Sequence, residues 1–175
     1  MGISLRNQQK RICVETRWLR KVGERALSIL ARPRAECSVM LVDDAAMAVL
    51  NRTYRGVAGP TDVLAFPMTE GRFREVSPDL LGDVVISTET ARRQALATGN
   101  EFRAELALLL IHGMLHLVGY DHGTAAERRR MWRKQRLILA ACGIQAVARA
   151  RVAREGRPRA ARRALPGSGR RGVGR

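Results

Sequence analysis

Apolar residues recur along the chain with two different spacings, which predicts both helices and strands. Over residues 18–31 they lie three and four positions apart, as on one face of a helix, and Pro33 closes this segment. Short apolar runs at residues 36–42, 61–66 and 80–87 are typical of buried strands. Because strands and helices follow one another in irregular order, the pattern predicts an α+β fold, with a small mixed β-sheet packed by helices.

Capping residues predict two further helices. Asp43 and Asp44 offer an N-cap for a short helix through Leu50, and the glycines and proline of residues 54–60 indicate a loop. Residues 88–98 have a helical composition and are followed by a glycine in a C-cap position. The sequence therefore places residues 54 and 55 in a loop and not in a helix.

The longest apolar segment predicts a helix at the centre of the fold. Asn100 can cap this helix, which from Leu106 to Val118 is apolar on nearly every side, the pattern of a buried central helix. Gly119 ends it. The apolar run of residues 106–111 is far too short to span a bilayer, so no membrane association is expected.

A capping box formed by Thr124 and Glu127 starts a final amphipathic helix that runs to about Ala141. Residues 149–175 consist mainly of Arg, Ala, Gly and Pro and cannot bury enough apolar surface to fold alone. We therefore expect a single hydrolase domain over residues 1–148, followed by a disordered Arg-rich tail. The basic residues on and around the polar face of the final helix are Arg128, Arg129, Arg130, Arg133, Lys134 and Arg136.

The chain is strongly basic. Thirty-two Arg and Lys stand against 16 Asp and Glu, which gives a formal net charge of +16. Residues 149–175 contain ten Arg and one Glu, or +9, so +16 minus +9 leaves +7 for the rest of the chain. This imbalance indicates a polyanionic partner, most often nucleic acid. A coding bias toward Arg would explain the excess of Arg over Lys, but not the excess of basic over acidic residues.

Cysteine usage and the start of the chain indicate a reducing compartment. The three cysteines, Cys13, Cys37 and Cys142, are odd in number and lack CxxC spacing, which argues against a disulfide framework and against a Cys-rich zinc site. The first residues contain no apolar segment of the kind found in a signal peptide. We therefore expect a cytoplasmic protein.

All three histidines of the chain lie in the segment HGMLHLVGYDH, residues 112–122. His112 and His116 are one helical turn apart and project from the same face. Gly119 releases the chain from the helix, so that His122 can return toward the same point. Three imidazoles around one ion are the protein ligands of a catalytic zinc, whose fourth position takes a water with a pKa of about 7. Imidazole also suits nickel, copper and iron.

Other interpretations of this segment are weaker. Two histidines on an apolar helix cost desolvation unless something binds them, which disfavours ordinary core histidines. A structural zinc usually has four ligands, and Cys142 is the only cysteine downstream. The histidine spacing is also that of the metzincin proteases, HExxHxxGxxH, but Gly113 replaces the glutamate that serves those enzymes as general base. Asp121 either supports a ligand histidine or forms a turn.

Three segments together resemble one known family. HGMLHLVGYDH is similar to the HGxLHLxGYDH signature of the YbeY family of bacterial rRNA-maturation endoribonucleases. Residues 51–67, NRTYRGVAGPTDVLAFP, resemble that family's N-x-x-YR…TDVLSFP segment, and residues 81–87, LGDVVIS, resemble its GD-I/V-x-IS strand. The order and spacing of the three segments fit as well, and the resemblance extends over roughly residues 12–143.

The resemblance implies a metal-dependent hydrolase, zinc-dependent in the usual assignment with one ion per chain, that cleaves single-stranded RNA. It implies a role in maturation of the small-subunit rRNA 3′ end and in ribosome quality control, with the small subunit, its proteins or assembly GTPases as partners. The family's metal ligands correspond to His112, His116 and His122, and its functionally important arginine corresponds to Arg55. A guanidinium suits that role because it contacts a phosphate through two hydrogen bonds.

Two questions of mechanism stay open. No carboxylate is an evident general base, so attack by an activated water and attack by the 2′-OH of the RNA are both possible, and only the second yields a 2′,3′-cyclic phosphate. The main rival to an enzyme is a non-catalytic ribosome-assembly factor that binds rRNA and uses the metal for its fold. Around the predicted active-site loop, Thr61 and Asp62 are expected to shape the loop and Ser87 to cap a helix.

Overall fold

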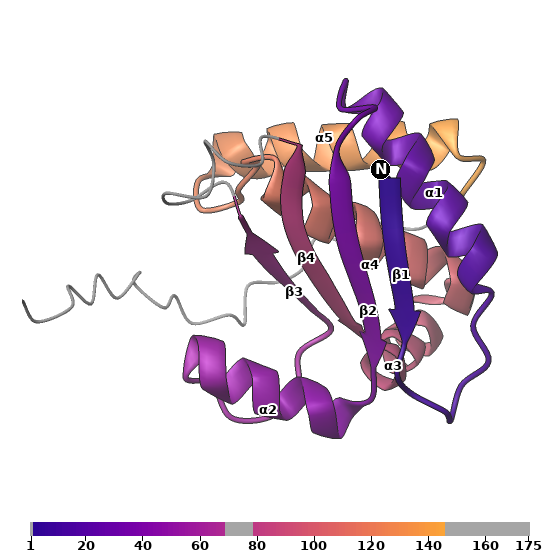
Figure 1. Ribbon diagram of the computed structural model, residues 1–175, viewed down its shortest axis with the longest axis vertical. Helices are drawn as coiled ribbons and strands as arrows, with labels where there is room; N and C mark the ends of the chain where they lie inside the picture. The colour runs from indigo at the N-terminus through magenta and orange to yellow at the C-terminus, as the bar shows by residue number, and fades with distance from the viewer. Residues whose placement is uncertain (1, 69–78, 146–175) are drawn as a thin grey trace, which may run out of the picture.

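The computed structural model describes residues 2–68 and 79–145, which form a four-stranded mixed sheet and five α-helices (Figure 1). This confirms the α+β fold predicted from the sequence. The strands are β1 (Gly2–Asn7), β2 (Glu36–Val42), β3 (Val63–Pro67) and β4 (Leu80–Ser87). The helices are α1 (Thr16–Ile29), α2 (Asp44–Arg55), α3 (Thr88–Thr98), α4 (Phe102–Leu117) and α5 (Ala125–Ala141).

The sheet has the strand order β1-β2-β4-β3. β1 pairs parallel with β2 and β2 parallel with β4, whereas β3 runs antiparallel to β4 at one edge. β1 was not predicted from the sequence. It forms the opposite edge, where Ile3 is its only fully buried residue, so it lacks the continuous apolar run by which the other strands are recognised.

The main core lies between one face of the sheet and the helices α1 and α4. Val84 and Ile86 point into this core, while Val85 between them joins a smaller cluster with Met47 on the other face, under α2. α4 contacts two strands and three helices, namely β3, β4, α1, α3 and α5. A helix enclosed on all sides must be apolar on all sides, which confirms the buried central helix.

Two helix boundaries differ from those predicted. α2 continues to Arg55 and ends at Gly56, whose left-handed backbone (φ 68°) lets its N–H donate to the carbonyl of Arg52. The predicted loop therefore begins at Gly56 and not at Tyr54, because neither Tyr54 nor Arg55 interrupts a helix. The helix α4 begins after Glu101, and Asn100 does not cap it.

Asn100 has another role at this helix start. Its side-chain amide donates to Oε2 of Glu105 at 2.9 Å. The pKa of Glu105 is nevertheless raised, because burial of the carboxyl outweighs the hydrogen bond from Asn100.

Other capping predictions are confirmed. Thr124 and Glu127 form both hydrogen bonds of a capping box at the start of α5, and the Ser87 hydroxyl accepts from the N–H of Thr90 at the start of α3. No helix in residues 2–68 and 79–145 has the length and apolar composition needed to cross a membrane. The tail predicted for residues 149–175 lies outside the described residues.

Candidate metal centre

The second half of α4 carries two of the three histidines. His112 is buried, with 7% of its surface exposed, and His116 one turn later is half-buried. Their Nε2 atoms lie 3.2 Å apart. Two ligands of a tetrahedral ion, each about 2.0–2.1 Å from the metal, are about 3.3 Å apart. The two imidazoles therefore already have the separation of a ligand pair.

A tight turn after α4 brings the third histidine to the same place. Gly119 adopts a left-handed backbone (φ 88°), and the N–H of Tyr120 donates to the Leu115 carbonyl at 2.9 Å. The carboxylate of Asp121 then accepts from the N–H of His122 at 2.7 Å, so Asp121 shapes the turn. As a result the His122 ring lies 5.0 and 5.7 Å, centroid to centroid, from the other two histidine rings.

The donor set fits an ion with an open coordination position. One nitrogen from each of His112, His116 and His122 lies within 4.8 Å of the other two. Among the described residues, no Cys, Asp or Glu completes this group to the four protein ligands of a typical structural zinc site. In particular Cys142, the one cysteine that follows the histidines in the sequence, is not part of the group. Three imidazoles and an open position are the arrangement of catalytic zinc sites.

The electrostatic surroundings keep His116 in its neutral form. Burial, and then the neighbouring His112, His122 and Arg55, together lower the pKa of His116 to about 4, against an opposing effect of Asp121. Only a neutral imidazole has a nitrogen lone pair for a metal. At neutral pH His116 is therefore ready to act as a ligand without first losing a proton.

Gln135 of α5 contacts the His112 ring at Nδ1, the nitrogen that does not face His116. The Nδ1 atom of His112 lies 3.1 Å from Oε1 of Gln135, which is 97% buried. An amide oxygen only accepts hydrogen bonds, so this contact places the imidazole proton on Nδ1 and leaves the lone pair on Nε2, toward His116. Gln135 was not among the site residues predicted from the sequence. The signal was a glutamine on the apolar stripe of α5, together with Met131 and Ile138.

Arg55 lies close enough to the histidines for its charge to act on His116. It is the last residue of α2, its side chain is exposed, and its charge contributes to the lowered pKa of His116. Two buried polar residues shape the loop that follows. The Asn51 amide donates to the Gly59 carbonyl at 2.9 Å, and Asp62 accepts from the N–H of Val63 at 2.7 Å.

Gly113 faces the sheet at close range. A Cβ atom at this position would lie 2.7 Å from Cγ1 of Val84 and 3.3 Å from Cγ2 of Val63, closer than side chains pack. A glutamate, the general base of the metzincin motif, therefore has no room here without displacing α4 from β4. The site thus lacks the residue on which peptide hydrolysis by that motif depends.

The chain matches known proteins over nearly all of its described length. A family model described as Endoribonuclease YbeY matches residues 4–143. Proteins named Endoribonuclease YbeY from Geobacter sulfurreducens and Moorella thermoacetica are both 46% identical to this chain over 142 residues. The first alignment covers 80% of this chain and 95% of the relative, and the second covers 71% and 91%.

A solved structure is similar as well. The solution structure of a Thermotoga maritima protein, 27% identical in sequence, matches with a TM-score of 0.58 over 80% of this chain and 88% of that protein. The segment matched by the family model contains Arg55 and all three histidines.

Proposed function

The chain belongs to the endoribonuclease YbeY family, and we propose that it hydrolyses phosphodiester bonds of single-stranded RNA with a metal ion held by His112, His116 and His122. The observation that carries this proposal is the convergence of three imidazole nitrogens within 4.8 Å. Zinc, one ion per chain, is the metal that best suits three nitrogen ligands with an open position. Such an ion would polarise a phosphate oxygen and lower the pKa of a water at the site.

The protein's own residues supply the rest of the chemistry. Gln135 holds the proton on Nδ1 of His112, so the nitrogen that faces the site is unprotonated. Arg55 extends from the end of α2 beside the histidines, where its guanidinium can bind the scissile phosphate and offset the charge that develops during cleavage. Asp121 accepts the N–H of His122 through Oδ1 and so holds the turn that carries the third histidine.

The family and the basic charge support a more specific role. We propose that the substrate is rRNA at the 3′ end of the small subunit, and that the protein acts there with the small subunit, its proteins or assembly GTPases. We also propose that it works in the cytoplasm, because its three cysteines are free thiols. The net charge of +16 suits the binding of rRNA.

The first experiment compares single-stranded and duplex forms of one end-labelled RNA. We expect cleavage of the single strand only, loss of cleavage after chelation, and recovery with one equivalent of zinc. The Arg55→Ala variant should be slower by about a hundredfold or more, as for loss of other groups that stabilise transition-state charge. Arg52→Ala, which removes an exposed arginine one turn earlier in α2, is the matched control.

The outcomes distinguish an enzyme from a non-catalytic ribosome-assembly factor. Cleavage that survives both chelation and the His116→Ala substitution would exclude the proposed site. Wild-type protein that binds RNA tightly but cleaves none with any divalent metal would support a non-catalytic assembly factor. A 2′,3′-cyclic phosphate on the product would show that the RNA 2′-OH attacks, and its absence would indicate water.

A further inference from the structure

The outer face of α5 carries four residues that form one strip. Arg129, Trp132, Arg133 and Arg136 are spaced i, i+3, i+4 and i+7, so they lie on the same side of the helix, over about 10 Å of its length. They line a shallow hollow of about 170 Å³. We call this set the Arg–Trp strip. Its face is turned away from Met131 and Gln135, the residues by which α5 is buried.

The charge of this helix is not balanced within the described residues. α5 has six basic residues and a single acidic one, Glu127, whose side chain caps the helix start. None of its arginines forms an ion pair with an acidic residue of the described segments. Arginines four positions apart on one helix repel each other, so the strip stabilises the fold less than neutral residues would. A bound polyanion would remove this repulsion.

Trp132 lies among arginines on the outer face of α5. It is half-buried, yet it is not among the apolar side chains that pack against the described core. Its neighbours are the arginines of the strip and Arg128, whose guanidinium lies 6.0 Å from the ring centroid. A tryptophan placed among arginines, outside the core that the described residues form, presents a flat aromatic surface on which a nucleic-acid base can stack.

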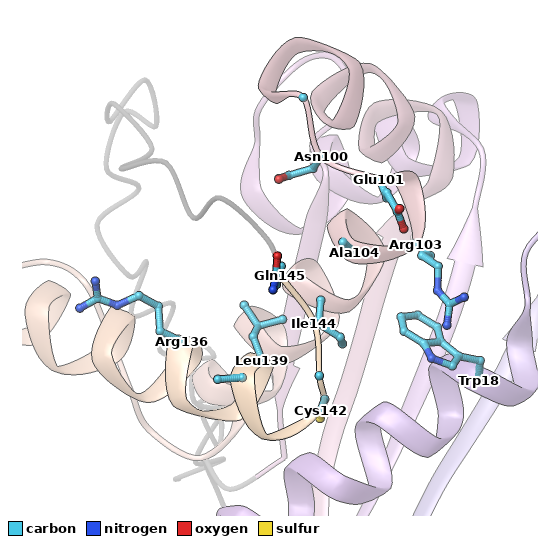
Figure 2. Close-up of a pocket in the computed structure, with 13 residues that line it drawn as sticks. Trp18, Asn100, Glu101, Arg103, Ala104, Arg136, Leu139, Cys142, Ile144 and Gln145 are labelled. Atoms are coloured by element: carbon cyan, nitrogen blue, oxygen red, sulfur yellow. The ribbon is translucent and has the colours of Figure 1, made fainter.

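The strip continues into a larger groove. Arg136 also lines a groove of about 810 Å³ between the starts of α1 and α4 and the end of α5 (Figure 2). There Trp18 stacks against Arg103 at 4.1 Å, although Glu101 also lines the groove. Both tryptophans of the chain therefore lie along one surface, interleaved with arginines.

This surface is tied to the metal centre by α5 itself. The helix begins three residues after His122, and its inner face supplies Gln135 to His112. We propose that the Arg–Trp strip binds the single-stranded RNA that flanks the cleavage site, with the arginines on phosphates and Trp132 stacked on a base. This inference rests on the proposed function for the identity of the polyanion, and it adds a binding surface outside the catalytic residues. An acidic protein is less suited, because it offers no flat bases for Trp132.

The test measures RNA binding separately from cleavage. A fluorescent single-stranded oligonucleotide with 2′-O-methyl groups is titrated with metal-free full-length protein at several salt concentrations. The triple variant Arg129→Ala/Arg133→Ala/Arg136→Ala should bind at least tenfold more weakly, and the slope of log K against log salt should fall by about 2. The control Arg6→Ala/Arg34→Ala/Arg92→Ala removes the same charge from three exposed arginines on other elements and should bind like wild type.

Trp132 is tested by its fluorescence and by substitution. In a Trp18→Phe background it is the only tryptophan, and RNA should quench its emission. Trp132→Ala should weaken binding about fivefold or more, whereas Trp132→Phe should retain most of it. These results can hold even if wild-type protein cleaves no RNA, so failure of the catalytic proposal is distinguishable.

Equal RNA affinity and equal salt slope for the strip variant and the control variant would overturn the inference. If the strip variant binds RNA like the control but binds poly-glutamate more weakly, the strip would belong to an acidic protein partner instead. Unchanged Trp132 fluorescence on saturation with RNA would overturn the stacking part of the proposal.

Discussion

Two polar clusters of this molecule are built in opposite ways. At the junction of α2, α3 and β4, the carboxylate of Asp44 accepts hydrogen bonds from the Ser87 and Thr90 hydroxyls at 2.5 and 2.7 Å and from the Arg93 guanidinium at 2.6 Å. The N–H of Asp44 in turn donates to Glu89 at 2.8 Å. Among the described residues, each buried side-chain nitrogen or oxygen atom of this cluster has a hydrogen-bond partner.

The histidine cluster is arranged differently. Its nitrogens converge on one another, and the Nε2 of His116 faces the Nε2 of His112 at 3.2 Å. Two lone pairs at that distance repel each other unless a proton or an ion lies between them. The two clusters therefore differ in purpose. Around Asp44 the donors match the acceptors, which stabilises the fold. The histidine nitrogens converge on one point, which suits the binding of an ion.

The largest expected effect is on metal binding. Replacing His116 with alanine should lower zinc affinity about a thousandfold, since one of three ligands supplies roughly a third of the binding free energy of a zinc site. The free energy of unfolding of the metal-free protein should change by less than about 1 kcal/mol, because among the described residues the half-buried imidazole has a single hydrogen-bond partner, Nε2 of His112. Competition with a chromophoric chelator and urea unfolding measure the two quantities. A large loss of stability in the metal-free His116→Ala variant would show that the histidine cluster also stabilises the fold.

Substitution in the Asp44 cluster should lower the stability of the fold and leave zinc binding unaffected. Asp44→Ala removes the acceptor of three side-chain hydrogen bonds and should lower the free energy of unfolding by about 2–3 kcal/mol. Zinc affinity should stay unchanged. Urea unfolding and the same chelator competition check both statements, and a loss smaller than about 0.5 kcal/mol would show that the cluster does not stabilise the fold.

Gln135 connects the fold to the metal centre. Gln135→Leu should weaken zinc binding by about ten- to a hundredfold, because the ring of His112 loses the acceptor for its Nδ1 proton. Gln135→Glu keeps an acceptor at the same place and should restore the affinity, which a purely structural role in packing would not do. If both variants bind zinc like wild type, Gln135 does not position the ligand.

The smallest effect concerns pH. Burial tends to raise the pKa of Asp44, but hydrogen bonds from Arg93, Ser87 and Thr90 hold it below the ordinary value of 3.8. The ionised carboxylate thus contributes stability that is complete above about pH 4 and is lost as the pH falls through the lower folded-state pKa.

Urea unfolding at several pH values tests this sign. Wild type should exceed Asp44→Asn by about 1 kcal/mol at neutral pH, and the difference should shrink toward about pH 3. A difference that grows in acid would contradict the assigned direction of the shift.

Much of the site could be predicted from local sequence. The spacing of His112 and His116, the turn at Gly119 and the return of His122 depend on helix periodicity and on one left-handed glycine. The capping box of α5 and the Ser87 cap of α3 are equally local. Such features are determined by residues within one or two turns, so they can be recognised without knowledge of the packing.

A long-range contact accounts for the missed strand β1, whereas the two misplaced helix boundaries have local causes. β1 is a strand because it pairs with β2, although its own sequence is only weakly apolar. Asn100 bonds to Glu105 instead of capping α4, and Arg55 completes α2 before the loop begins at Gly56. Only β1 depends on a distant partner, and the two helix boundaries were set by neighbours in the sequence, Glu105 and Gly56.

Helical spacing and a glycine turn bring the three histidines together, and both features can be recognised in the local sequence. Tertiary packing added three features: Gln135 sets the proton of His112, Gly113 has no room for a catalytic glutamate, and the charge of Arg55 acts on His116. These depend on how α5, the sheet and α2 pack around α4. Packing joins residues that are distant in sequence, and no local pattern records those contacts.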